Sequence, residues 1–245
     1  MKQSGFIKLA NIIKQLKDIC DQAAQNKETV KTMYTNFDPR KDARITTFSK
    51  MVNLFTSVQL SLNFVLKGLS NLDVWRIIID EEPPPSSDMK IFYAGAFMNF
   101  TKIGFNQLLF STTESSLRLF LRALDLDACD GGMGSFKSVY DCLFRVKLSV
   151  CPSEGIELLD LFRLVRNTSH NNGVYFDPNP NRQDITIVWR RKPYKFKQST
   201  PIDFVTWPFV VEISDAVRSL MYTVVTDNNL RAVAHEIKDP YQFAK

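Results

Sequence analysis

Apolar residues recur at helical spacing through most of this chain of 245 residues, and this repeat limits the fold more than any other feature. The repeat is clear over residues 4–35, 44–72, 89–125, 135–149 and 209–225. Apolar side chains three and four residues apart lie on one face of an α-helix, which can then pack against other helices. The sequence therefore predicts a mainly α protein built around a helical bundle.

One segment changes to a strand-like period. Ile185–Trp189 is rich in β-branched residues, Tyr194–Lys197 alternates polar and apolar residues, and Arg190–Pro193 between them is expected to turn. We predict a small β-hairpin over about residues 183–198, inserted before the last long helix.

The strongest break in the helical pattern is the run of three prolines, Pro83–Pro85. Prolines cannot continue a helix, so we interpret the run as a semi-rigid connector. It separates an N-terminal helical region, residues 1–82, from a C-terminal helical bundle, residues 88–245, and the two could still pack as one domain. Just before it, the β-branched run Val74–Ile79 fits either a strand or the end of a helix.

Composition narrows the functional classes. A net charge of +5 permits contact with nucleic acid without requiring it. Four cysteines without a CxxC pair, and only two histidines, argue against a zinc site, and we expect no metal or cofactor. The chain has neither a run of about 18 apolar residues nor the apolar core of a secretory signal. We therefore expect no membrane span and a cytoplasmic protein with free thiols.

The most informative stretch is Ser153–Tyr175, which reads as one helix and its end. Asn171-Asn172-Gly173 should stop this helix, because Asn and Gly tolerate the left-handed conformation of a C-cap. Its apolar stripe consists of Leu158, Leu161, Phe162 and Val165. A second arc, largely opposite that stripe, carries Arg163, Arg166, Asn167 and His170.

This polar cluster has two interpretations. It is either a solvated face that ends in a histidine capping the last carbonyls of the helix, or a phosphate-handling site. In such a site arginine binds phosphate and histidine moves protons near neutral pH.

The run Arg166-Asn167-Thr168-Ser169-His170 resembles the signature of HEPN domains, the higher-eukaryote and prokaryote nucleotide-binding superfamily. These are compact all-helical domains, and many are metal-independent ribonucleases of toxin–antitoxin, abortive-infection and CRISPR systems. Their motif has an Arg, usually a polar residue, and a His after four to six intervening positions. Here three residues separate Arg166 from His170 and six separate Arg163 from His170. The resemblance covers about residues 90–225.

The resemblance implies roles for individual residues. His170 would be the general acid/base, Arg163 or Arg166 would steady the phosphate, and Asn167 would orient His170. Glu114, four residues before Arg118, matches the acidic residue that positions the arginine in this family. Two copies would face each other in a homodimer, without a metal. Without the resemblance, Glu114 and Arg118 are an ordinary i, i+4 ion pair.

The predicted hairpin is strongly basic. Its aromatic residues, Trp189, Tyr194 and Phe196, alternate with the cations Arg190, Arg191, Lys192, Lys195 and Lys197. Such a ribbon could bind RNA through phosphate attraction and base stacking. The alternative is a solvated hairpin whose lysines prevent another strand from pairing with its edge. We favour this second interpretation.

Two functions follow from this sequence. The first is a HEPN-like, metal-independent endoribonuclease of a defence or toxin–antitoxin system. The alternative is a non-catalytic module that binds a nucleotide or a protein, such as an inactive relative or an antitoxin-like partner. Catalysis requires an exposed His170 in a cleft near an arginine, whereas capping bonds it to its own helix end.

Overall fold

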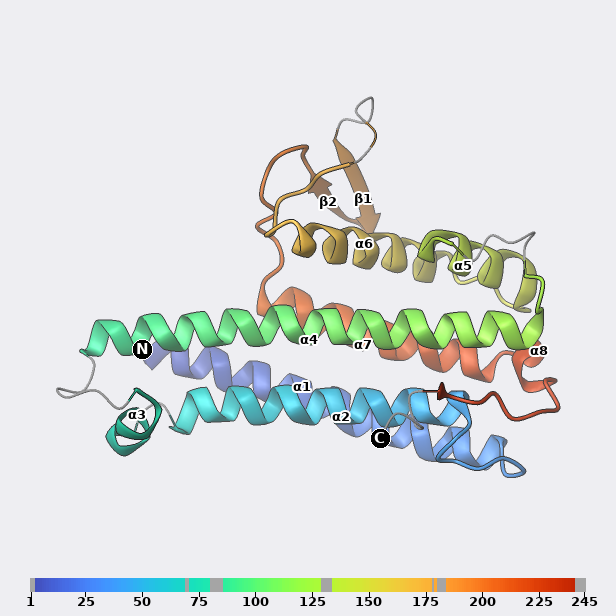
Figure 1. Ribbon diagram of the computed structural model, residues 1–245, viewed down its shortest axis with the longest axis horizontal. Coiled ribbons are helices and arrows are strands. Elements are labelled where there is room, and N and C mark those ends of the chain that lie inside the picture. The colour runs from blue at the N-terminus through green and yellow to red at the C-terminus, as the bar shows by residue number, and fades with distance from the viewer. Residues whose placement is uncertain are drawn as a thin grey trace.

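Four long helices form an elongated bundle in the computed structural model, which describes residues 3–68, 71–79, 86–128, 134–177, 179 and 184–240 (Figure 1). The four are α1 (Gln3–Met33), α2 (Ala43–Asn63), α4 (Ser87–Leu124) and α7 (Trp207–Thr226). Helices α1 and α2 pack against each other, α2 also packs on α4, and α1 on α7. The prediction of a mainly α bundle is confirmed.

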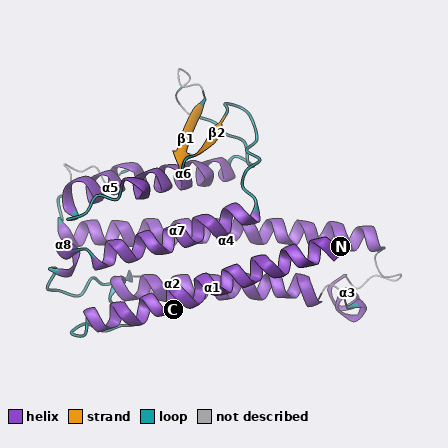
Figure 2. Cartoon of the chain, turned by 180° about the vertical axis from the view of Figure 1, so that it is seen from behind, coloured by secondary structure: helices purple, strands orange, loops and turns teal. Residues whose placement is uncertain are grey.

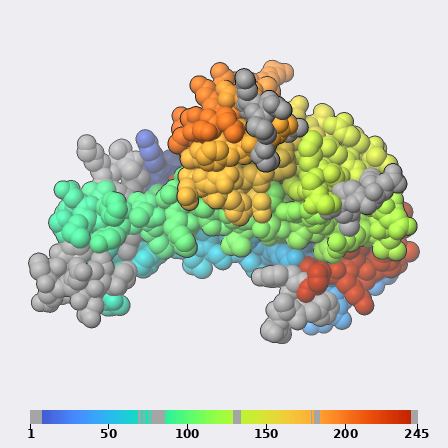
Figure 3. All heavy atoms as spheres, turned by 45° about the horizontal axis from the view of Figure 1, so that its top comes forward, coloured from blue at the N-terminus to red at the C-terminus, as the bar shows by residue number. Residues whose placement is uncertain are grey.

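A second layer lies on the α4 and α7 side of the bundle (Figures 1 and 2). It contains α5 (Phe136–Cys142), the π-helical turn η2 (Leu143–Lys147) and α6 (Ser153–His170). Above α6 stands the predicted hairpin, in which β1 (Ile185–Trp189) pairs antiparallel with β2 (Lys192–Phe196). In the space-filling view this layer covers only part of α4, whose N-terminal portion extends beyond it (Figure 3).

One hydrophobic core joins the two layers. The predicted stripe of α6, including Leu161, Phe162 and Val165, is fully buried. The ring of Phe110 on α4 packs edge-on against Phe162 on α6 at 5.2 Å and against Phe136 on α5 at 5.1 Å. These contacts fix α6 on the bundle, and so place the face that carries its polar arc.

A buried ion pair fastens the C-terminal segment to the start of α2. Arg44 and Asp42 are both fully buried and their side chains bond at 2.5 Å. The Arg44 guanidinium lies 4.2 Å from the Tyr34 ring centroid and 4.6 Å from that of Phe37. It also donates to the His235 carbonyl at 3.1 Å, so every face of this charge is occupied.

Several local predictions need correction. Val74–Ile79 is neither a strand nor the end of the preceding helix: it belongs to a separate helix, α3 (Leu72–Ile79). Burial of Trp75 beside Tyr93, with ring centroids 6.0 Å apart, outweighs the strand preference of its β-branched neighbours. Before it, α2 ends at Asn63 and continues as a π-helical turn, η1 (Phe64–Gly68).

The turn of the hairpin is shorter than predicted. Only Arg190 and Arg191 form it, with φ of 49° and 61°, and Lys192 already belongs to β2. Two successive left-handed residues make the tight connection that matches the twist of the strands. Near the C-terminus a short helix, α8 (Asn228–Arg231), follows α7.

Other predictions concern breaks and thiols. The prolines Pro83–Pro85 lie outside the described residues, as do residues 129–133. Cys20 and Cys151 are free, but Cys142 is disulfide-bonded, so the expectation of free thiols fails at that position. Over the described ranges, no helix combines the length and apolar character needed to cross a membrane.

Candidate functional site

The end of α6 has the geometry that its sequence predicts. The helix ends at His170, and the chain then turns through Asn172 and Gly173, with φ of 54° and 83°. The Gly173 N–H donates to the Thr168 carbonyl at 3.0 Å, which closes the helix in the manner of a Schellman motif. This turn leaves His170 on the last, exposed position of the helix.

An open depression of about 580 Å³ lies at this helix end and brings together three of the five predicted catalytic residues. Arg166, Asn167 and His170 line it from α6. The Arg166 Nη1 donates to Asn167 Oδ1 at 3.2 Å, and its guanidinium carbon lies 5.5 Å from the Phe110 ring centroid. Both contacts hold the guanidinium at the floor of the depression while its other N–H groups can meet a ligand.

The imidazole of His170 is available to a ligand. Within the described part of the chain it makes no hydrogen bond to the carbonyls of its own helix end. The last turn is closed instead by backbone bonds and by the Thr168 hydroxyl, which donates to Leu164 O at 2.7 Å. No hydrogen bond therefore supports the capping interpretation, and the exposed imidazole lines the same depression as Arg166.

The opposite wall of the depression consists of residues that sequence reasoning did not select. Phe176 is 50% exposed there, and beside it Asp177 accepts a hydrogen bond from the Tyr175 hydroxyl at 3.2 Å. The Asp177 N–H donates to Gln198 Oε1 at 3.0 Å, which ties this wall to the end of β2. The wall exists because the chain after the hairpin returns to pair with it, and no local pattern signals that return.

Arg163 lies elsewhere on α6 and does not line the depression. Its Nη2 donates to Asp160 Oδ1 at 3.4 Å, and Asp160 also accepts from the Tyr140 hydroxyl at 2.6 Å. Burial tends to lower the pKa of Arg163, but its bond to Tyr140 and the charge of Asp160 outweigh this and raise it. Arg163 is therefore a fixed, charged part of the contact between α5 and α6.

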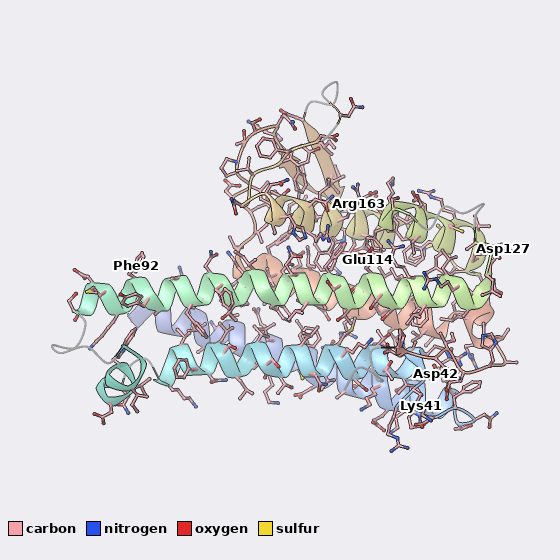
Figure 4. The ribbon with its side chains drawn as sticks, viewed as in Figure 1. Lys41, Asp42, Phe92, Glu114, Asp127 and Arg163 are labelled. Carbon is pink, nitrogen blue, oxygen red and sulfur yellow. The ribbon has the colours of Figure 1, made fainter. Side chains whose placement is uncertain are left out.

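Glu114 forms the local ion pair with Arg118. Arg118 donates to Glu114 Oε1 through Nη2 at 2.6 Å and through Nε at 3.0 Å. Glu114 lies on the side of α4 that faces α6, toward Arg163 (Figure 4). It does not line the depression, and among the described residues it bonds Arg118 and not Arg166.

All five predicted cations of the hairpin are exposed, but two of them are already paired. Arg190 bonds Glu154 at 2.8 Å and Lys192 bonds Glu212 at 3.3 Å. The other three cations make no ion pair among the described residues, namely Arg191, Lys195 and Lys197.

The aromatic residues of the hairpin face the protein. Trp189, Tyr194 and Phe196 are buried and meet Phe204 and Phe209 in one aromatic cluster, in which Tyr194 lies 5.2 Å from Phe204 and 5.4 Å from Phe209. Buried rings are not available to stack on bases, so base stacking by these rings, the interpretation that we did not favour, gains no support. The alternation of the strands sends the rings inward and the cations outward.

Among the residues that the structure describes, no group of three or more His, Cys, Asp or Glu is placed to hold a metal ion. No protein-family model, curated protein or solved structure matches the chain.

Proposed function

We propose that this protein is a HEPN-like endoribonuclease that cleaves RNA at the α6 depression without a metal. One observation carries the proposal: Arg166, Asn167 and an exposed His170 line a single depression at the end of one helix. These groups supply what the reaction needs, a proton acceptor near neutral pH and a cation for the developing charge.

The chemistry follows from those groups. Neutral His170 removes the proton of a ribose 2′-hydroxyl, whose oxygen attacks the adjacent phosphorus as the bond from phosphorus to the 5′-oxygen breaks. Arg166 stabilises the charge on the phosphoryl oxygens, and Asn167 holds the arginine at 3.2 Å. The leaving 5′-oxygen takes up a proton, so the products are a 2′,3′-cyclic phosphate and a 5′-hydroxyl.

The same resemblance suggests how the site would be completed. A second copy of the chain would face the first in a homodimer and supply the proton for the leaving oxygen. The basic residues of the hairpin extend from the same wall, since Gln198 beside Lys197 bonds Asp177. Phosphates on either side of the cleaved bond would meet these cations.

The test is a ribonuclease assay in excess chelator with wild-type protein, His170→Ala and His235→Ala. His235 is the matched control, because it is the other histidine, is exposed and lies away from the depression. Cleavage by the wild type and by His235→Ala, but not by His170→Ala, supports the proposal. Equal cleavage by all three proteins overturns it.

The alternative function is a non-catalytic module that binds a nucleotide or a protein. The spacing of the motif favours it, because only three residues separate Arg166 from His170, fewer than the four to six of catalytic HEPN motifs. RNA or nucleotide binding without cleavage, weakened by Arg166→Ala, would select this alternative.

A further inference from the structure

A second cavity, remote from the α6 depression, runs along the contact between α2 and α4. Its volume is about 490 Å³, and the residues at its edges come from one side of each helix and from the segment around Asp239. The α2–α4 groove is lined by two helices of the bundle, whereas the α6 depression is lined from α6 in the second layer. Figure 1 shows the positions of these helices. The proposed ribonuclease reaction uses none of the residues of the groove.

The groove is long and narrow. Its lining on α4 runs from Leu108 to Arg122, fourteen residues apart, which is a span of about 21 Å at 1.5 Å per residue. A groove of this length that holds only about 490 Å³ is elongated, and it suits an extended chain better than a compact ligand.

The groove has two chemically different ends. Because α2 and α4 run antiparallel, the start of α2 lies beside the C-terminal part of α4. Thr47 and Ser116 bond side chain to side chain at 2.7 Å, and the rings of Phe55 and Phe105 lie 5.8 Å apart. Later residues of α2 therefore meet earlier residues of α4, and Lys50 shares one end of the groove with the C-terminal part of α4.

The end that contains Leu54 and Leu108 is neutral. These two leucines line it together with the small hydroxyl side chains of Ser57 and Ser111. Leu108 is 56% exposed, a high fraction for a leucine on a packed helix. No described residue that lines the groove is aromatic, so a flat ring would find no stacking partner there.

The other end is basic. Lys50 bonds Asp239 at 2.6 Å, and Arg118 bonds Glu114 at 2.6 Å. Arg122 also lines this end, is exposed, and pairs with no carboxylate among the described residues. Its guanidinium is thus the group that an incoming anion would meet.

We propose that the α2–α4 groove binds a single-chain anionic amphiphile of the fatty-acid class. The carboxylate bonds Arg122, and the aliphatic chain runs from there along the groove toward Leu108 and Leu54. Each part of the ligand matches one part of the groove. The neutral end accommodates the aliphatic chain, and the cation at the other end binds the carboxylate.

The experiment titrates the full-length protein with decanoate below its micelle-forming concentration and measures binding by calorimetry. Decanol, which has the same chain without the charge, is the ligand control. Arg122→Ala should weaken decanoate binding about tenfold, as the loss of one charge-assisted hydrogen bond predicts, and leave decanol binding unchanged. Ser111→Leu, which fills the neutral track at an exposed position, should weaken binding of both ligands. Arg145→Ala, at an exposed arginine outside the groove, should change neither.

Three results would overturn the proposal. The first is no saturable binding of decanoate to the wild type, and the second is equal loss of affinity in Arg122→Ala and Arg145→Ala. The third is binding only after removal of the residues beyond Pro240, which would identify the chain's own terminus as the occupant. None of these results depends on ribonuclease activity.

Discussion

The hydroxyl of Tyr140 on α5 donates a 2.6 Å hydrogen bond to Asp160 Oδ1 on α6, and Arg163 reaches the same oxygen at 3.4 Å. Burial and the bond to Asp160 raise the pKa of Tyr140, so the phenol keeps its proton at neutral pH and donates this bond. The three side chains form one polar contact between the helices. Arg163 is committed to it, which leaves Arg166 as the arginine of the depression.

The two arginines should therefore differ when each is replaced by alanine. Arg166→Ala should abolish metal-free RNA cleavage and leave stability nearly unchanged. Arg163→Ala should keep cleavage but lower the free energy of unfolding by about 1–3 kcal/mol, since it removes a partly buried charge that Asp160 binds. Cleavage assays and urea denaturation of both variants give the answer, and a loss of cleavage only in Arg163→Ala would reverse the assignment.

The stability of the fold should depend on pH through Asp227, which caps α8. Its carboxylate accepts hydrogen bonds from the Ser149 N–H at 2.9 Å, the Ser149 hydroxyl at 2.6 Å and the Asn229 N–H at 2.9 Å. Burial alone would raise its pKa, but these bonds outweigh burial and lower it. A lowered native pKa stabilises the fold above the unfolded value of about 3.9, and this gain is lost as pH falls through the native pKa.

Asp227→Asn should accordingly cost about 1–3 kcal/mol of unfolding free energy at pH 7 and progressively less below pH 4. Urea denaturation at a series of pH values measures this difference. Asp203→Asn, at an exposed aspartate, is the control. A cost for Asp227→Asn that is the same at pH 3 and pH 7 would contradict the argument.

The hairpin cations should fall into two groups when RNA binding is measured against salt. Replacing Lys195 and Lys197 by glutamine should weaken binding and reduce the salt dependence by about two phosphate contacts. Replacing Arg190 and Lys192 by glutamine should change RNA binding and its salt dependence less, because Glu154 and Glu212 already neutralise their charges. Equal effects of the two double variants would show that those ion pairs open when RNA binds.

The helices and the end of α6 could be predicted because their signals are local. Apolar spacing located α1, α4, α6 and α7 to within a few residues, and Asn-Asn-Gly located the stop after His170. The spacing of Arg166, Asn167 and His170 also predicted that they share one arc of the helix. Residues on one arc lie close together, so this prediction was sufficient to bring them to the same depression.

The remainder of the site depends on long-range contacts, which leave no periodic signal. Phe176 and Asp177 reach the depression only because Gln198, twenty-one residues after Asp177, holds that segment. The choice between Arg163 and Arg166 was set by Tyr140, which lies on another helix. Trp189 is a further case in which the local pattern was not sufficient. The alternation of a strand divides its side chains between two faces, but it does not show which face packs on the core.

Two helical glycines should respond to alanine with opposite signs. A Cβ at Gly104 of α4 would meet no atom within 4 Å, whereas one at Gly155 of α6 would lie 2.6 Å from Leu220 Cδ1 and 3.2 Å from Pro152 Cγ. Gly104→Ala should raise the unfolding free energy by about 0.5–1 kcal/mol, because alanine loses less conformational entropy in a helix. Gly155→Ala should lower it by about 1–3 kcal/mol, since either the buried Leu220 side chain must leave its packed position or α6 must move away from α7. Urea denaturation measures both, and cleavage by Gly155→Ala then reports whether the depression depends on how closely α6 packs. Stabilisation by both substitutions would mean that Leu220 can move aside without cost.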